Sequence, residues 1–206
     1  MGRKPLDIDK LALDLVLSDD LNFKKELAKK ITVLAYKKGI YLSSIHDLYL
    51  ARGKAEFSGW TIPAFNLRCL TYDLSKAMFR VAKRNNSGTF IFEIAKSEMG
   101  YTAQPPVEYS AVILAAALKE GYAGPVFIQG DHFQVNAKKY GEDPEKEIEG
   151  LKTLISEAVA NGFYNIDIDS STVVDLAKAD LKKQQFPNYT VCAKLTHFIR
   201  QIQPRG

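Results

Sequence analysis

An acid and an imidazole stand together at the end of an apolar run in the middle of the chain. The segment GPVFIQGDHFQVN opens with a Gly-Pro turn and places Asp131 and His132 directly after the residues expected to form a buried strand. Imidazole is the commonest protein ligand of catalytic divalent metals, and a carboxylate beside it can move protons. Gly130 allows a close approach of the backbone. The alternative is a loop in which Asp131 caps a turn and His132 faces solvent.

A second pair of carboxylates lies in the segment FYNIDID. Asp167 and Asp169 are two residues apart, so they share one face of a strand. Burying two carboxylates without a cation or hydrogen-bond donors is costly. A cap on the turn at Ser170 and Ser171 would explain Asp169, but it explains Asp167 poorly. Glu93 is a third acid expected on an inward face, with a buried ion pair to a lysine as the alternative.

Composition excludes several other kinds of site. Cys69 and Cys192 lie in no metal-binding spacing, and His46 and His197 are expected on solvated helix faces. The net charge of +4 is spread over short basic pairs, so we expect no nucleic-acid partner. The charged N-terminus does not resemble a signal peptide, and no apolar run approaches the roughly 20 residues of a membrane span. We therefore expect a cytoplasmic protein with no membrane partner.

Short β-rich runs alternate with helical ones from about Trp60 onward. The predicted strands are Trp60–Leu67, Thr89–Ala95, Val126–Gln129 and Phe163–Asp169. The predicted helices are Thr71–Lys83, Pro106–Lys119, Pro144–Asn161 and Tyr189–Ile202. This alternation predicts βαβ units and a parallel sheet. The third of these helices has both ends marked, by Asp143 as N-cap and by Gly162 just past its end.

One face of the predicted strands is partly polar. Asn66, Glu93, Gln129 and Asp131 alternate with aliphatic and aromatic residues, and they lie toward the carboxyl ends of the strands. A doubly wound sheet is apolar on both faces, whereas the interior of a (β/α) barrel carries polar groups near its active-site mouth. The chain also lacks a Gly-x-Gly-x-x-Gly motif. The pattern therefore favours a barrel.

The first 55 residues have a different pattern. Leu21–Lys38 and Ser43–Ala51 are predicted as helices with no strand between them. We therefore expect a helical N-terminal extension over residues 1–55, followed by a partial (β/α) barrel of four parallel βα units over residues 56–206. The extension would pack on the sheet or on a partner.

Four sequence blocks resemble the class II, metal-dependent ketose-bisphosphate aldolases, which cleave fructose- or tagatose-1,6-bisphosphate. They are IPAFN, TFIFEIAKSEMG, GPVFIQGDHFQ and GFYNIDIDSST, in the order of the family, and they span about Trp60 to the C-terminus. IPAFN and the Asp-His strand are fairly specific as a pair. The resemblance implies the N-terminal half of a TIM (β/α)8 barrel.

The resemblance also implies roles for individual residues. His132 would be a ligand of a catalytic Zn²⁺, and Asp131 would be the acid/base for the hydroxyl or carbonyl formed when the carbon–carbon bond breaks. Asn66 and Asp169 would bind substrate, and Asp169 would also lie close to the metal. Breaking that bond leaves an enediolate on dihydroxyacetone phosphate, which a divalent metal stabilises as a Lewis acid. The side chains expected to surround and support these groups are those of Glu93, Gln129 and Asp167.

The chain departs from the family in several places. Ala95 stands where many members have Ser, and the chain stops before the strands that carry a further glutamate, two metal-binding histidines and the phosphate-binding loop. We therefore expect a fragment, truncated or split, that acts on a phosphorylated ketose with a complementary C-terminal half or as a homo-oligomer. The alternatives are a non-catalytic aldolase-type subunit, and an α/β module that binds sugar phosphate without metal.

Overall fold

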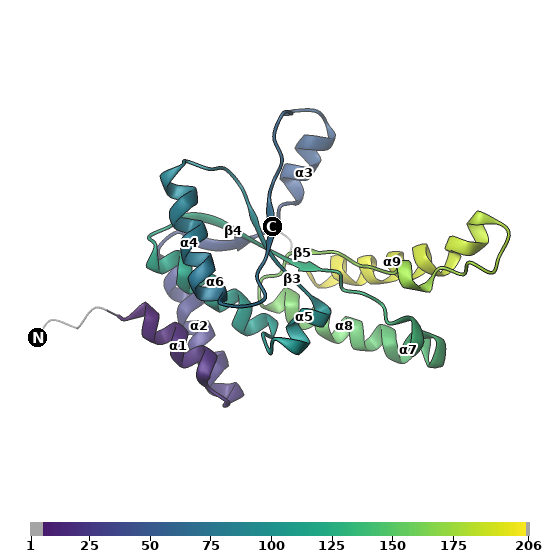
Figure 1. Ribbon diagram of the computed structural model, residues 1–206, viewed down its shortest axis with the longest axis horizontal. Coiled ribbons are helices and arrows are strands. Elements are labelled where there is room, and N and C mark those ends of the chain that lie inside the picture. The colour runs from purple at the N-terminus through teal and green to yellow at the C-terminus, as the bar shows by residue number, and fades with distance from the viewer. Residues whose placement is uncertain (1–5, 205–206) are drawn as a thin grey trace, which may run out of the picture.

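The computed structural model describes residues 6–204, which form a mixed α/β fold around a parallel sheet. The strand order is β1-β4-β3-β2, and β5 pairs with β4 on the edge that β1 also uses. The strands are β1 (Ile40–Ser43), β2 (Ala64–Asn66), β3 (Ile91–Ala95), β4 (Gly124–Asp131) and β5 (Asn165–Ile166). All four pairings are parallel, which confirms the predicted βα units (Figure 1).

Helices join the successive strands. Those after β2 are α4 (Thr71–Arg84), α5 (Lys96–Tyr101), α6 (Pro106–Lys119), α7 (Ala137–Glu142), α8 (Pro144–Ala160) and α9 (Leu181–Ile202). The predicted bounds of α6 and the start of α8 are confirmed, because Pro106 and Pro144 each open a helix. The Asp143 side chain accepts from the Lys146 N–H over 3.1 Å, as an N-cap does. Helix α9 begins earlier than predicted, at Leu181, where Asp180 caps it.

The N-terminal segment corrects one expectation. The helices α1 (Ile8–Leu17), α2 (Leu21–Lys37) and α3 (His46–Gly53) are present, but strand β1 lies between α2 and α3. The prediction of no strand there was wrong. Gly39, with φ 73°, turns the chain at the end of α2, and the next residues alternate between buried and exposed, as strand residues do.

The N-terminal helices share the core of the sheet. Leu15 and Ile31 are fully buried in the same cluster as Ile113 of α6. Lys24 of α2 forms an ion pair with Glu108 of α6, and both side chains are largely buried. The predicted extension therefore packs on the sheet domain through α6.

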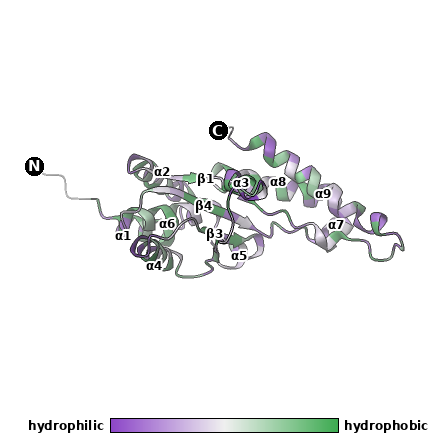
Figure 2. Ribbon diagram, turned by 90° about the horizontal axis from the view of Figure 1, so that it is seen from above, coloured by the Kyte–Doolittle hydropathy of each residue, from purple (hydrophilic) through white to green (hydrophobic). Residues whose placement is uncertain are grey.

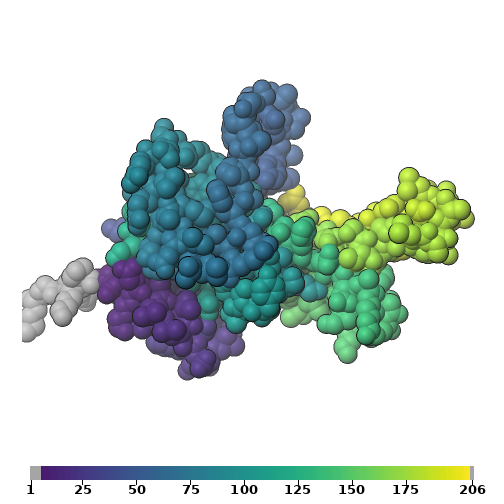
Figure 3. All heavy atoms as spheres, viewed as in Figure 1, coloured from purple at the N-terminus to yellow at the C-terminus, as the bar shows by residue number. Residues whose placement is uncertain are grey.

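The main core lies on one face of the sheet. Phe92, Ile94, Val126 and Ile128 are all buried in it, together with residues of α4, α6 and α8. Helices α8 and α9 lie alongside each other and extend away from the sheet (Figure 2). The space-filling view shows α3 and the far end of α9 projecting from the central body (Figure 3). Among residues 6–204, no helix is long and apolar enough to cross a membrane.

Candidate metal and ligand site

A row of polar side chains crosses the sheet. The register places Asn66 opposite Glu93, Glu93 opposite Gln129, and Gln129 opposite Asn165. Residues that are level on neighbouring strands project to the same face, and here that face is opposite the apolar core. The Gln129 Nε2 group donates to Glu93 Oε2 over 3.3 Å. The structure therefore brings together on one face the residues that sequence alternation had assigned to it.

The strand ends above this row hold the candidate metal site. Asp131, the last residue of β4, His132 and Asp167 each offer one ligand atom, and these atoms lie within 4.8 Å of one another. This group could hold a metal ion. The Asp131 side chain is 19% exposed and that of His132 is 64% exposed, so the group is open to solvent on the His132 side.

The backbone around His132 fixes this arrangement. His132 has φ 43°, a left-handed conformation that is unfavourable for a residue other than glycine. Its N–H donates to Asp167 Oδ2 over 3.3 Å, and the next N–H, of Phe133, donates to the Asp167 carbonyl over 2.9 Å. Phe133 is fully buried, and a Cβ on Gly130 would lie only 2.5 Å from its ring. Local strain of this kind often marks a functional site.

Electrostatics at the strand ends favour a cation. Burial raises the pKa of the Asp131 carboxyl; His132 opposes the rise and the charge of Asp167 adds to it. Burial also raises the pKa of Glu93, and the charges of Asp131 and Glu98 add to that rise. Several carboxylates in one partly buried region repel one another, and a divalent cation would relieve that repulsion.

Asp169 lies outside the candidate metal group. Its carboxylate accepts from the Ser171 N–H over 3.0 Å and from the Ser171 Oγ over 2.6 Å. Gln134 Nε2 donates to its other oxygen over 2.5 Å. Burial alone would raise the pKa of Asp169, but these hydrogen bonds outweigh it and lower the pKa. Asp169 therefore caps the turn that follows it, while Asp167 takes the place beside His132.

Asn66 belongs to a network that sequence reasoning missed. Its Nδ2 donates to Glu98 Oε2 over 2.7 Å, and the Ala95 N–H donates to the same oxygen over 2.8 Å. Arg68 Nε lies 2.5 Å from the other Glu98 oxygen. Glu98 is buried, so it is a buried charge satisfied from three sides. Only its place three residues after a strand, where a helix begins, could have suggested this role.

A polar cavity of about 620 Å³ adjoins the candidate metal group. Gln129, Asp131 and Asp167 line one part of it, and residues of α3 and the last turns of α9 line another. Arg200 and His46 belong to that second part, and their side chains meet with 3.4 Å between Nη2 and Nε2. The lining of the cavity therefore includes two carboxylates, from β4 and the chain leaving β5, and a guanidinium group from α9.

No family model, curated protein sequence or solved structure matches this chain. The arrangement of its own residues therefore carries the functional argument. That arrangement is a solvent-open Asp-His-Asp group next to a polar cavity, at the carboxyl ends of parallel strands.

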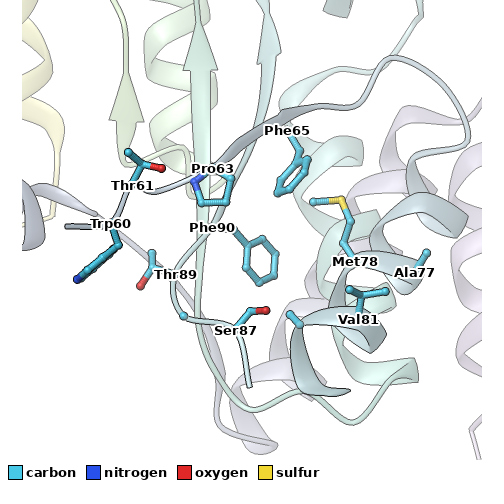
Figure 4. A pocket seen from close by; sticks show the side chains of 12 residues that line it. Trp60, Thr61, Pro63, Phe65, Ala77, Met78, Val81, Ser87, Thr89 and Phe90 are labelled. Atoms are coloured by element: carbon cyan, nitrogen blue, oxygen red, sulfur yellow. The ribbon is translucent and has the colours of Figure 1, made fainter. Parts of the chain in front are cut away.

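A second cavity, of about 560 Å³, is apolar (Figure 4). It lies between β2 and α4, and Phe65, Phe90, Met78 and Val81 point toward it. Trp60, at its rim, is 46% exposed and stacks on Phe57. Its lining contains no ionisable side chain. The cavity is therefore suited to packing rather than to catalysis.

Of the other histidines and the cysteines, His46 lines the polar cavity, and His197, Cys69 and Cys192 line neither of the two cavities described above. His197 is exposed on α9, where its Nε2 lies 3.0 Å from Gln201 Nε2. His46 is also exposed, as expected, although it lines the polar cavity. Cys69 and Cys192 are free cysteines and do not belong to the metal group.

Proposed function

We propose that this chain acts as a class II ketose-bisphosphate aldolase, in which His132 and Asp167 would hold a divalent metal, zinc, beside the acid/base Asp131. The observation that carries the proposal is the approach of these three ligand atoms to within 4.8 Å at the tips of β4 and β5, beside a polar cavity. Imidazole and carboxylate oxygens are ordinary zinc ligands, so the donor set fits the ion. Zinc would supply Lewis acidity toward an oxygen of the ketose phosphate.

The residues take different roles in this proposal. His132 and Asp167 hold the ion, because both are exposed and the His132 N–H orients Asp167. Asp131 would move the proton of the hydroxyl group next to the bond that breaks, because its carboxyl lies beside the metal group and lines the polar cavity. Gln129 precedes Asp131 by two residues on β4, so it lies on the same face of the strand, where it donates a hydrogen bond to Glu93.

We propose further that the sheet is the first half of a (β/α)8 barrel. Three features support this: the neighbouring order of β2, β3, β4 and β5, the polar row on one face, and the open edges of β2 and β5. Strand β1 departs from a regular half barrel, because it occupies the first part of the β4 edge. The partner would be a complementary half, and its outer helix would fill the apolar cavity beside β2.

Metal content tests the first part of the proposal. The purified chain, dialysed against zinc and then against buffer, should retain about one zinc per chain by atomic absorption. His132→Ala and Asp167→Asn should each weaken zinc binding by at least about tenfold, because each removes a ligand. His197→Ala, which alters an exposed histidine outside the group, is the matched control. Stoichiometric zinc in the His132→Ala protein would refute the site.

Cleavage of the bisphosphate tests the role of Asp131. The zinc-loaded chain should release dihydroxyacetone phosphate from fructose- or tagatose-1,6-bisphosphate. Asp131→Asn should slow this cleavage by about 100-fold or more, because it removes the group that takes the proton of the hydroxyl next to the bond that breaks. An unchanged rate in Asp131→Asn would dismiss the acid/base role of this carboxyl.

A further inference from the structure

Arg200 and His46 line the polar cavity together with the carboxylates, and both are exposed residues. Arg200 is in the last turn of α9, and His46 is the first residue of α3. Between residues 6 and 204, the structure records no ion pair for Arg200, whereas Arg68 and Arg80 pair with Glu98 and Glu120. The Arg200 guanidinium therefore faces the cavity with His46 as its recorded side-chain neighbour.

The elements that carry these two residues are anchored. Gln203 donates from Nε2 to the Tyr164 carbonyl over 3.1 Å, which ties the end of α9 to the chain entering β5. Ile199, one residue before Arg200, is 7% exposed, and Ile45, one residue before His46, is 3% exposed. The Ile45 N–H donates to Asn165 Oδ1 over 2.8 Å. Contacts to Tyr164 and Asn165 therefore hold the elements that carry Arg200 and His46 close together, and the two side chains meet at the cavity.

Two hydroxyl groups also line the cavity. Ser44 and Thr196 line it together with Arg200 and His46. Guanidinium, imidazole and hydroxyl groups are the side chains that donate to phosphate oxygens, and arginine can do so with two parallel hydrogen bonds. The carboxylates of Asp131 and Asp167, which line the same cavity, would repel a phosphate, so a bound phosphate group would favour Arg200 over these carboxylates.

We infer that the Arg200 end of the cavity binds the phosphate group of a small phosphate monoester, whose oxygen-bearing carbons then point toward Asp131 and Asp167. The identification of the ligand as a ketose phosphate rests on the proposed function. The phosphate site itself rests only on the unpaired guanidinium, His46 and the cavity that they line.

Inorganic phosphate in the presence of EDTA tests the phosphate site apart from the metal. Calorimetric titration of the whole chain should show saturable binding, and Arg200→Gln should weaken it about 10- to 100-fold, which is the range for losing hydrogen bonds to a charged group. His46→Gln should weaken it less. Arg84→Gln is the matched control, because Arg84 is also an exposed arginine in the last turn of a helix, outside the cavity.

The outcomes separate this inference from the proposed function. Equal phosphate binding by the native chain and Arg200→Gln, or no saturable binding by the native chain, overturns the inference. Loss of phosphate binding in Arg200→Gln while zinc is retained supports it. Phosphate binding that depends on Arg200, in a chain that binds no zinc, leaves the phosphate site standing and rejects the aldolase, in favour of a sugar-phosphate-binding module without metal. Circular dichroism and thermal melts of each variant confirm that it folds.

Discussion

The backbone N–H of His132 donates to Oδ2 of Asp167 over 3.3 Å, across 35 residues of sequence. This bond joins the turn after β4 to the chain leaving β5, and it sets the Asp167 carboxylate beside the His132 ring. Because the bond comes from the backbone, a change of the His132 side chain removes the imidazole without removing the positioning bond. Side-chain substitutions at position 132 therefore separate metal binding from local structure.

His132→Gly should be more stable than His132→Ala, and both changes should remove metal binding. At φ 43° a residue with a Cβ costs about 1–2 kcal/mol more than glycine. His132→Gly should therefore have a higher free energy of unfolding than His132→Ala by about 1 kcal/mol, measured by urea denaturation. Both variants should lose zinc equally. A His132→Gly protein no more stable than His132→Ala would show that the left-handed turn is absent in solution.

Gly130 should not tolerate a larger residue. A Cβ at this position would lie 2.5 Å from the ring of Phe133, which is fully buried and cannot easily move. Gly130→Ala should lower the free energy of unfolding by about 1–3 kcal/mol. Gly150→Ala is the control, because its Cβ meets no atom and alanine favours the interior of α8; it should raise stability by up to about 1 kcal/mol. A similar effect of both changes would contradict the packing at Gly130.

The Glu98 network should make stability depend on pH in the acid range. Burial raises the pKa of Glu98, but hydrogen bonds from Ala95 and Asn66 and the charge of Arg68 outweigh it, so the folded-state pKa lies below the ordinary 4.5. Its stabilising contribution is therefore complete above about pH 4.5 and is lost as the pH falls through the lower, folded-state pKa.

Urea denaturation of Glu98→Gln and Glu157→Gln measures this dependence. The Glu157 side chain has no recorded ion pair within residues 6–204. The free energy of unfolding of Glu157→Gln should therefore fall between about pH 6 and pH 3 as much as that of the native protein. Glu98→Gln should be less stable at about pH 6 and should fall less steeply. Identical slopes for the two variants would remove Glu98 as a source of the acid sensitivity.

Asn165 should stabilise the junction of three strands. Its Oδ1 accepts from the Ile45 N–H over 2.8 Å, and its Nδ2 donates to the Ile128 carbonyl over 3.0 Å. Asn165→Ala leaves the N–H of a buried residue unpaired, so the free energy of unfolding should fall by about 1–3 kcal/mol. Asn161→Ala, which removes only a bond to the Glu157 carbonyl at an exposed helix end, should cost less than about 1 kcal/mol. Hydrogen exchange at Ile45 should rise in Asn165→Ala alone.

Local sequence signals determined the bounds of α6 and α8 and the faces of the strands, whereas α1, α5 and α7 were not predicted. Proline at the first position, aspartate as N-cap and glycine after the last turn fixed α8 within a residue, because these residues satisfy or replace the unpaired groups of helix ends. Alternation placed Asn66, Glu93 and Gln129 on one face, because successive strand residues point to opposite sides. These effects act over a few residues, so the sequence carries them directly.

Only the tertiary structure decided which residues meet. Strands β1 and β4 are paired although more than 80 residues separate them in the sequence, and no local sequence pattern predicts that pairing. The choice of Asp167 over Asp169 as the neighbour of His132 depends on the turn after β4, whose N–H groups at His132 and Phe133 donate to Asp167 after the neighbouring strand β5. Arg200 and His46 meet across 154 residues. The assembly of a site from distant segments depends on packing and hydrogen bonds between elements. Sequence reasoning singled out Asp131, His132 and Asp167, but it did not single out Arg200, and it expected His46 on a solvated helix face.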